Sequence, residues 1–226
     1  DVSPFVGGHH FEGSLRELSS LGTTLAACHD TLSGFPYSQK VKNSAQKRES
    51  ELESTRRLIY EALSTGQLSI FAERESWAVS HQGWLGEMVE NLRCDLSGLP
   101  GARCLHGEIT PANVLFTRDQ SQAVLLDFEE GVHIFAPIDW DIAYFVQRFC
   151  MTDDPSTSVL RRRLDAIEDG YGRTLPKVAE SMRQAAWTAI VVMVGLRISH
   201  GVETPITEWD KFYRLERQAV SYRGKV

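Results

Sequence analysis

The spacing of the apolar residues changes near residue 102, and this change restricts the possible folds of the chain more than any other feature. Upstream, apolar residues recur at every third or fourth position, which is the spacing of an amphipathic helix. This spacing predicts helices over residues 14–29, 45–63 and 77–92. Downstream, short apolar runs alternate with loop residues, as in a small sheet. These runs predict strands over residues 102–105, 114–117 and 123–127.

Helical spacing returns after Pro137 and continues to the end of the chain. It predicts four more helices, over residues 140–149, 156–171, 176–199 and 206–222. Residues 118–121 suit the tight turn of a hairpin between the second and third strands. The sequence therefore predicts a mainly α fold with a small β-hairpin insertion, in a chain of 226 residues that is long enough to bury a core.

Charge and hydropathy argue against two classes of partner. The formal net charge of -6 disfavours binding to nucleic acid or to an anionic membrane surface. The most apolar run, residues 185–196, is shorter than the stretch of about 20 residues that a helix needs to cross a bilayer. We therefore expect a protein that binds neither nucleic acid nor a membrane.

The cysteines and the N-terminal residues favour a cytoplasmic location. The four cysteines form no CxxC pair and lack the spacing of a secreted disulfide framework, so we expect reduced thiols. They are Cys28, Cys94, Cys104 and Cys150. Residues 1–13 contain no basic segment followed by an apolar one, which argues against a signal peptide.

Three polar side chains around the predicted hairpin form the candidate site. Glu108 and Asn113 lie in the loop before the second strand, and Asp127 ends the predicted third strand. A hairpin brings these two strand ends together, so the three side chains can converge on one small volume. Carboxylate and amide oxygens, without histidine or cysteine ligands, suit a hard cation such as Mg²⁺, which also binds phosphate oxygens.

This pattern resembles that of the aminoglycoside phosphotransferase and choline kinase family. The family layout is H-G-[D/E]-x-x-x-x-N, a hairpin, then D-F/W and a downstream D-[L/I]-A, with matches here at His106, Asn113, Asp127 and Asp141. These proteins are relatives of the protein kinases, whose equivalent motifs are H-R-D-x-x-x-x-N and D-F-G. The resemblance implies the C-terminal lobe of a protein kinase-like α+β fold. Residues 21–29 are similar to the first helix of that lobe, and the family often has a pair like Gly170-Tyr171.

The resemblance also implies a role for each of these residues. Glu108 would be the catalytic base that accepts the proton of the acceptor hydroxyl, and His106 would brace the catalytic loop. Asn113 and Asp127 would hold Mg²⁺ against the phosphates of the nucleotide. Asp141 would tie the catalytic loop to the helix that follows it.

The implied activity is transfer of the terminal phosphoryl group of ATP or GTP to a hydroxyl of a small molecule. The acceptor would be aminoglycoside-like or an amino alcohol, and a cationic acceptor agrees with the acidic chain and with the glutamates after Asp127. In this family the helices before the catalytic loop, here about residues 45–96, select the acceptor.

The chain departs from the family pattern in two places. Glutamate at position 108 replaces the usual aspartate and moves the carboxylate by about 1.5 Å, and a misplacement of about 1 Å can cost roughly a hundredfold in rate. The glycine-rich strand-turn-strand of the family's nucleotide-binding lobe is not found, because Gly7-Gly8 is not followed by alternating strands. We expect residues 1–226 to form a single helical catalytic lobe, without the N-terminal nucleotide-binding lobe. The rival function is a non-catalytic pseudokinase or an isolated substrate-binding lobe.

Two groups of charged residues each leave two interpretations open. His9, His10 and Glu12 are either metal ligands or part of a solvated segment flanked by glycine. Glu129 and Glu130 either approach a second Mg²⁺ or a cationic substrate, or they are exposed loop charges.

Two further sequence patterns are an aromatic stripe in a predicted helix and a run that also occurs in zinc enzymes. The stripe of Trp77, Trp84 and Met88 is either core or a wall of the substrate site. The run from His106 to Glu108 also begins the signature of the zinc deaminases, but the chain has no P-C-x-x-C, which excludes that class.

Overall fold

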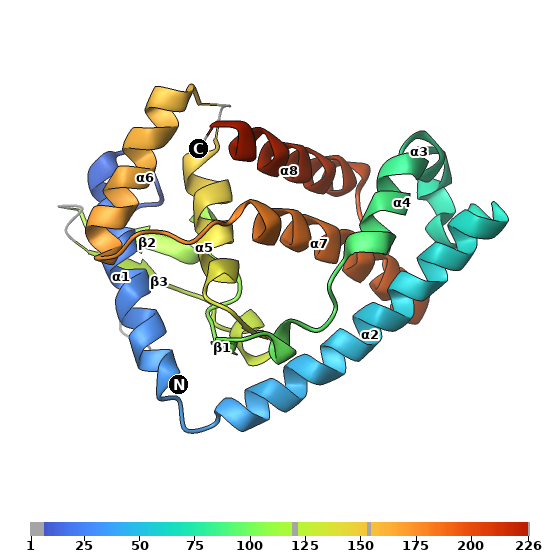
Figure 1. The fold of residues 1–226 in the computed structure, drawn as a ribbon, viewed down its shortest axis with the longest axis horizontal. Coiled ribbons are helices and arrows are strands. Elements are labelled where there is room, and N and C mark those ends of the chain that lie inside the picture. Colours follow the sequence, from blue (N-terminus) through green and yellow to red (C-terminus); the bar gives the residue numbers. More distant parts are fainter. Residues whose placement is uncertain (1–6, 119–121, 153–154, 226) are drawn as a thin grey trace.

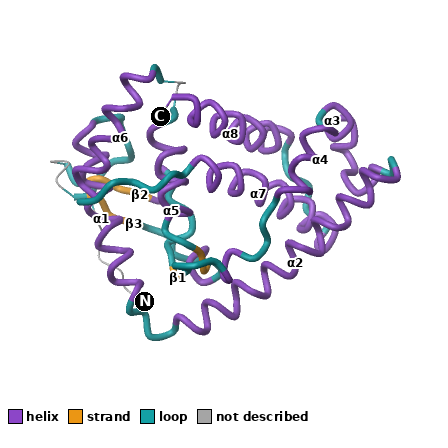
Figure 2. The backbone as a smooth tube through the Cα atoms, in the orientation of Figure 1, coloured by secondary structure: helices purple, strands orange, loops and turns teal. Residues whose placement is uncertain are grey.

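The structure is a computed structural model, and it describes residues 7–118, 122–152 and 155–225. Helices account for most of these residues, and two short antiparallel strand pairs lie among them (Figures 1 and 2). The predicted fold class is therefore confirmed. The turn predicted at residues 118–121 lies mostly outside the described residues.

The first helix begins at a complete capping box. The hydroxyl of Ser14 accepts a hydrogen bond from the backbone N–H of Glu17, and the Glu17 carboxylate accepts one from the backbone N–H of Ser14. α1 (Leu15–Ser33) then continues four residues beyond its predicted end. α2 (Ser38–Thr65) is also longer than predicted and crosses the lower right of Figure 1 as the longest helix drawn.

The single helix predicted over residues 77–92 is wrong. The chain forms α3 (Glu75–Ser80) and α4 (Gln82–Asn91), which are separated at His81. The ring of His81 stacks on Trp77 with centroids 4.1 Å apart, and its Nδ1 lies 2.8 Å from the Trp77 carbonyl oxygen, which also accepts the His81 backbone N–H at 3.0 Å. A 3-10 segment, η1 (Leu68–Arg74), precedes α3.

The strands are shorter than predicted. β2 (Val114–Phe116) pairs with β3 (Ala123–Leu125), in register from Val114 opposite Leu125. β1 (Arg103–Cys104) pairs with β4 (Phe135–Ala136), and β4 was not predicted, because two residues carry no periodic signal. His9 adds a single bridge to Phe116 at the free edge of β2.

Four helical segments follow the strands. α5 (Asp139–Phe145) continues into one π-helical turn, η5 (Val146–Cys150). α6 (Thr157–Tyr171) has nearly its predicted bounds, whereas α7 (Ala179–His200) begins three residues late and α8 (Ile206–Lys225) ends three residues late. Among the described residues, no helix combines the length and apolar character that a membrane span requires.

Helices α1 and α6 lie against each other at two glycines, on the left of Figure 1. A Cβ atom on Gly170 would come within 1.8 Å of the Ser19 carbonyl oxygen, and one on Gly22 would come within 2.7 Å of the Ile167 carbonyl oxygen. Only glycine permits backbones this close.

The core has two large apolar clusters and a small one. The first belongs to α1, the hairpin, α5 and α6. The second belongs mainly to α2, α3, α4 and α7. The small cluster contains Leu105, Ala136, Trp140 and Ala185, so it connects α5 to α7 directly beside the loop that follows β1. Figure 1 shows α5 between the two groups of helices.

Candidate functional site

The candidate site begins where β1 ends and the chain turns toward the hairpin. Gly107 has a φ of +94°, a conformation that L side chains rarely adopt. A Cβ atom on Gly131 would meet the Leu105 carbonyl oxygen at 2.8 Å. The segment from Leu105 to Gly107 therefore packs closely against the 3-10 turn η4 (Glu130–Val132).

Asp141 on α5 holds the backbone of this turn. Its side chain is fully buried, and its two oxygens accept hydrogen bonds from the backbone N–H groups of His106 and Gly107, each at 2.9 Å. His29 on α1 provides a third bond, with its Nε2 at 3.1 Å from Oδ2. A buried carboxylate is tolerated when it accepts several hydrogen bonds. The Asp141 carboxylate thus connects the turn to two helices, α5 and α1.

Tyr171 extends this contact to α6. Its hydroxyl lies 2.7 Å from Nδ1 of His29, and both side chains are almost completely buried. Burial raises the pKa of Tyr171, so the hydroxyl keeps its proton. When Nε2 of His29 donates to Asp141, Nδ1 accepts from the Tyr171 hydroxyl. Tyr171 therefore favours the tautomer of His29 that Asp141 needs.

His106 connects the turn to the exit of the hairpin. Its Nε2 lies 2.8 Å from the carbonyl oxygen of Leu126, to which it donates, and its ring lies 4.4 Å from that of Phe128. The side chain is fully buried. His106 thus packs between the loop and the segment that carries Asp127.

Asn113 and Asp127 are brought together through the backbone. The Asn113 side-chain nitrogen donates to the Glu108 carbonyl oxygen at 3.1 Å, and the Leu126 N–H donates to the Asn113 carbonyl oxygen at 2.9 Å. Asp127 does not end β3, as predicted, but lies two residues beyond it. Its φ of +58° turns the chain out of the ladder, and its side chain is exposed.

The oxygen donors at this point fit Mg²⁺. Because the Asn113 amide nitrogen is bonded to Glu108, its amide oxygen remains available. One carboxylate oxygen of Asp127 accepts a weak bond from the Glu129 N–H at 3.4 Å, and the other has no partner among the described residues. One amide and one carboxylate oxygen leave places for water and phosphate oxygens, as Mg²⁺ requires.

Glu108 lies on the other side of the loop, at the wall of a cavity of about 240 Å³. Its carboxylate forms no hydrogen bond or ion pair with any described residue. The walls of the cavity come from α2, α5, α7, α8 and the segment after α4, and they include Leu52, Leu96, Trp140, Tyr144, Ala189 and Phe212. Asp127 does not line the cavity, so Glu108 and Asp127 face different spaces.

The glutamates after Asp127 differ from each other. Glu130 lines the cavity and forms an ion pair with Arg48 of α2. Glu129 is exposed, and its side chain has no partner among the described residues. Of the two interpretations, the exposed loop charge describes Glu129, whereas Glu130 has a structural partner.

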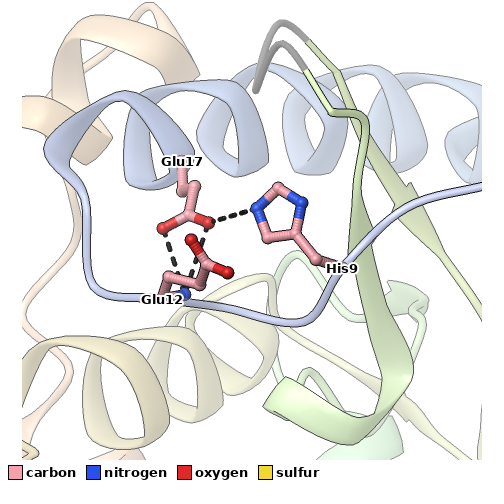
Figure 3. A group of neighbouring side chains, drawn as sticks. All are labelled: His9, Glu12 and Glu17. Carbon is pink, nitrogen blue, oxygen red and sulfur yellow. Dashed lines mark hydrogen bonds and ion pairs between the residues drawn. The ribbon is translucent and has the colours of Figure 1, made fainter.

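The N-terminal acidic and histidine residues form a small cluster, which Figure 3 shows. Potential ligand atoms of His9, Glu12 and Glu17 lie within 4.8 Å of one another. The Glu17 carboxylate already accepts bonds from Nε2 of His9 at 3.0 Å and from the backbone N–H groups of Glu12 and Ser14. These bonds account for the cluster as the cap of α1. His10 lies apart from it and contacts the Pro111 carbonyl oxygen at 3.0 Å.

The aromatic stripe before the loop is core. Trp77, Trp84 and Met88 are buried in the second cluster, and none of them lines the cavity. The indole nitrogens of Trp77 and Trp84 donate to carboxylates of α8, those of Asp210 and Glu216. The interpretation as a substrate wall is therefore wrong.

The cavity residues on α7 were not predicted from the sequence. Ala185, Thr188, Ala189 and Val192 lie three or four positions apart and line the cavity on one face of the helix. The only signal was the recurrence of small residues within an apolar run, and such a run is equally common in a helix that packs without a gap.

Comparison with known proteins assigns the fold and motifs to a family. A sequence model of the phosphotransferase enzyme family (APH) matches residues 2–180. The chain therefore belongs to this family of phosphotransferases. No curated protein matches its sequence.

The comparison with solved structures gives one match with a TM-score above 0.6 and one with a lower score. The AMP-bound spectinomycin phosphotransferase APH(9)-Ia matches with a TM-score of 0.62 and 14% identity, over 96% of this chain and 70% of that chain. An aminoglycoside phosphotransferase from Alicyclobacillus acidocaldarius subsp. acidocaldarius DSM 446 matches with a TM-score of 0.47 and 15% identity, over 98% of this chain and 68% of that chain. The first match shows that the chain has a kinase-like fold.

Proposed function

We propose that this protein transfers the terminal phosphoryl group of ATP or GTP to a hydroxyl group of a small molecule. The observation that supports this most is the arrangement of the loop after β1. Asp141 holds its start, and its end is bonded to the segment beside Asp127. Glu108 then lines a cavity, while Asp127 is exposed outside it. An acceptor in the cavity and a nucleotide at Asp127 would meet at this loop.

The nucleotide side would depend on Asn113 and Asp127. Their free oxygens would hold Mg²⁺ beside the phosphates, and the bound cation supplies charge neutralisation during the transfer. The AMP bound in the spectinomycin phosphotransferase supports a nucleotide as the donor. Family membership supports the same assignment.

The acceptor side would depend on Glu108. Phosphoryl transfer has a loose transition state, so positioning matters more than early removal of the proton. The hydrogen bonds to His106 and Gly107 fix the backbone just before Glu108, and its unpaired carboxylate reaches the cavity. The extra methylene of glutamate is therefore compatible with the role of base. His106 would position the loop without contacting the substrate.

We also infer that the described elements form one lobe rather than two domains. The small cluster around Trp140 connects α5 to α7, whose other buried residues belong mostly to different large clusters. The four cysteines are free, which supports the proposed cytoplasmic location.

Replacement of Asp127 tests the function. In the full-length protein with Mg²⁺ and ATP or GTP, Asp127→Ala should abolish phosphate transfer and nucleotide hydrolysis, because a ligand of the cation is lost. Asp165→Ala is a matched control, since Asp165 is exposed on α6, far along the chain from the loop. Unchanged turnover of Asp127→Ala would contradict the assignment. A wild-type protein that binds nucleotide without any turnover would support the rival function, a non-catalytic binding lobe.

A further inference from the structure

The cavity beside Glu108 is small and enclosed mostly by apolar side chains. Ligand pockets for drug-sized molecules have volumes of roughly 300–1,000 Å³, whereas this cavity has about 240 Å³. Its apolar walls come from several elements, and they include Leu52, Ile134, Phe135, Val192, Met193 and Phe212. The cavity is partly open to solvent, so the part of a molecule that lies inside it must be compact, and burial of an apolar body is favourable there.

The space itself exists because α7 has small residues at this face. Ala185, Thr188 and Ala189 lie within one turn of the helix and face the cavity together. Larger side chains at these positions would fill it. The size of the cavity therefore depends on the sequence of α7 and can be reduced by a single substitution.

Most carboxylates at the cavity wall already have partners within the protein. Glu130 is paired with Arg48. Glu49 accepts hydrogen bonds from the backbone N–H and the hydroxyl of Ser97, at 2.6 and 2.7 Å. Among the wall carboxylates, only that of Glu108 has no bond to a described residue. Arg93, an exposed residue, also lines the cavity and adds a positive charge to its surroundings.

A cation next to Glu108 would also weaken it as a base. A positive charge nearby stabilises a carboxylate and lowers its proton affinity. Since Glu108 is the only unengaged wall carboxylate, it cannot both pair with a cationic acceptor and take up its proton efficiently.

Two wall residues offer polar atoms that lack partners. The indole N–H of Trp140 and the hydroxyl of Thr188 are inaccessible to solvent and form no hydrogen bond with any described residue. Unsatisfied buried polar groups are costly. Because solvent does not reach either atom, neither is a hydrogen-bond partner for a ligand in the cavity, whose lining is mainly apolar.

We propose that the acceptor is a compact, uncharged alcohol with a mainly apolar body, held in this cavity with its hydroxyl toward Glu108. This inference rests on the proposed phosphotransferase function and narrows its acceptor. It disfavours a multi-ring, polycationic aminoglycoside, because the cavity holds only part of such a molecule and its lining offers one carboxylate, that of Glu108, without a bond to a described residue. It also predicts that a neutral alcohol binds more tightly than a cationic amino alcohol of the same shape.

The transfer forms one bond, breaks one bond and moves one proton. The acceptor oxygen forms a bond to the terminal phosphorus of the nucleoside triphosphate while the bond from that phosphorus to the bridging oxygen breaks. The hydroxyl proton passes to the Glu108 carboxylate. The products are a phosphate monoester and a nucleoside diphosphate.

The test compares three probes by ligand-observed NMR binding and by phosphate transfer with the full-length protein. The probes are choline, dimethylbutanol (its neutral analogue, with carbon in place of nitrogen) and the three-ring aminoglycoside kanamycin. We expect dimethylbutanol to bind at least about tenfold more tightly than choline, a difference of roughly 1.4 kcal/mol. Kanamycin should not compete with it.

Substitutions on α7 show whether the binding is in the cavity. Ala189→Leu should abolish dimethylbutanol binding, and the smaller change Ala189→Val should weaken it, so that one of them is informative if the other fails to fold. Leu196→Trp, at an exposed position of the same helix, should leave it unchanged.

The outcomes separate this inference from the proposed function. Tighter binding of choline than of dimethylbutanol, binding of kanamycin in the cavity, binding that survives Ala189→Leu in a folded protein, or no binding of any probe would overturn the inference. Binding of dimethylbutanol that depends on Ala189, without any phosphate transfer, would contradict the proposed function but support the ligand class.

Discussion

At the scale of single residues, the loop after β1 is held by side chains that do not line the cavity. Asp141 accepts three hydrogen bonds from the loop and from His29, and Tyr171 bonds the other nitrogen of His29. The candidate base, Glu108, has no such support for its own carboxylate. The position of Glu108 therefore depends on the backbone before it, which is hydrogen-bonded to Asp141.

Glu108→Gln tests the base. Glutamine has the same size but cannot accept the proton, so kcat should fall by at least about tenfold while the KM for nucleotide changes little. Steady-state kinetics with saturating Mg²⁺ would measure both values. Glu90→Gln removes an equal charge from an exposed position of α4 and should retain the parent kcat. If kcat of Glu108→Gln equals that of the parent, Glu108 is not the base.

Tyr171→Phe tests the positioning network. Loss of the hydroxyl leaves Nδ1 of the buried His29 without a donor, which should cost about 1–3 kcal/mol of stability. The loop would also become less restrained, so we expect kcat to fall roughly tenfold with little change in KM. The ¹⁵N chemical shifts of the His29 ring would report the loss of a single tautomer. Unchanged shifts and kcat would mean that Tyr171 has no positioning role.

At the scale of secondary structure, the contact between α1 and α6 places His29 and Tyr171 within reach of each other. The helices meet at Gly22 and Gly170, where their backbones approach closely. A residue pair separated by 142 positions in the chain then forms one hydrogen bond. The helix pair thus supports the loop although neither helix contains a candidate catalytic residue.

Gly170→Ala tests this contact. The new Cβ atom would lie 1.8 Å from a backbone oxygen of α1, so the helices must separate. We expect a loss of at least about 2 kcal/mol in the free energy of unfolding. Gly86→Ala provides the opposite control, because nothing lies within 4 Å of its Cβ position in α4, and it should stabilise the protein by up to about 1 kcal/mol. Equal stability of Gly170→Ala and the parent, measured by urea denaturation, would contradict the close contact.

At the scale of the whole molecule, the helical body buries several ionisable groups that have no role in the proposed transfer. Burial raises the pKa of Cys28, Cys94 and Cys150 from 9.0 to about 12. Burial also raises the pKa of Tyr144, at the cavity wall, from 10.0 to about 12. All four groups therefore favour their neutral, protonated forms in the folded protein.

These shifts predict loss of stability in alkali. Below about pH 9 both the folded and the unfolded chain keep these protons, so the stability is unaffected. Between about pH 9 and pH 12 the unfolded chain releases them while the folded chain retains them, so the free energy of unfolding falls as the pH rises. Denaturant midpoints measured across this range should decrease steadily. A midpoint that stays constant up to about pH 11 would show that these groups are accessible.

Local sequence was sufficient for most of the helices but not for all of them. The bounds of α6 followed from its apolar spacing, because one face of that helix packs on α1 along its whole length. The break at His81 did not follow, since the apolar spacing continues across it, while the ring of His81 stacks on Trp77 and its Nδ1 shares the Trp77 carbonyl oxygen with the backbone N–H. The two-residue strand β4 had no local signal at all and exists through its pairing with β1.

The sequence by itself determined the fold class and the order of the motif residues Glu108, Asn113, Asp127 and Asp141, because helical spacing and residue order are properties of the chain itself. Only the tertiary structure decided that Glu108 and Asp127 face different spaces and that a cavity of about 240 Å³ lies beside Glu108. The physical reason is distance along the chain: the cavity walls come from α2, α5, α7 and α8, and their side chains become neighbours only when the helices pack together.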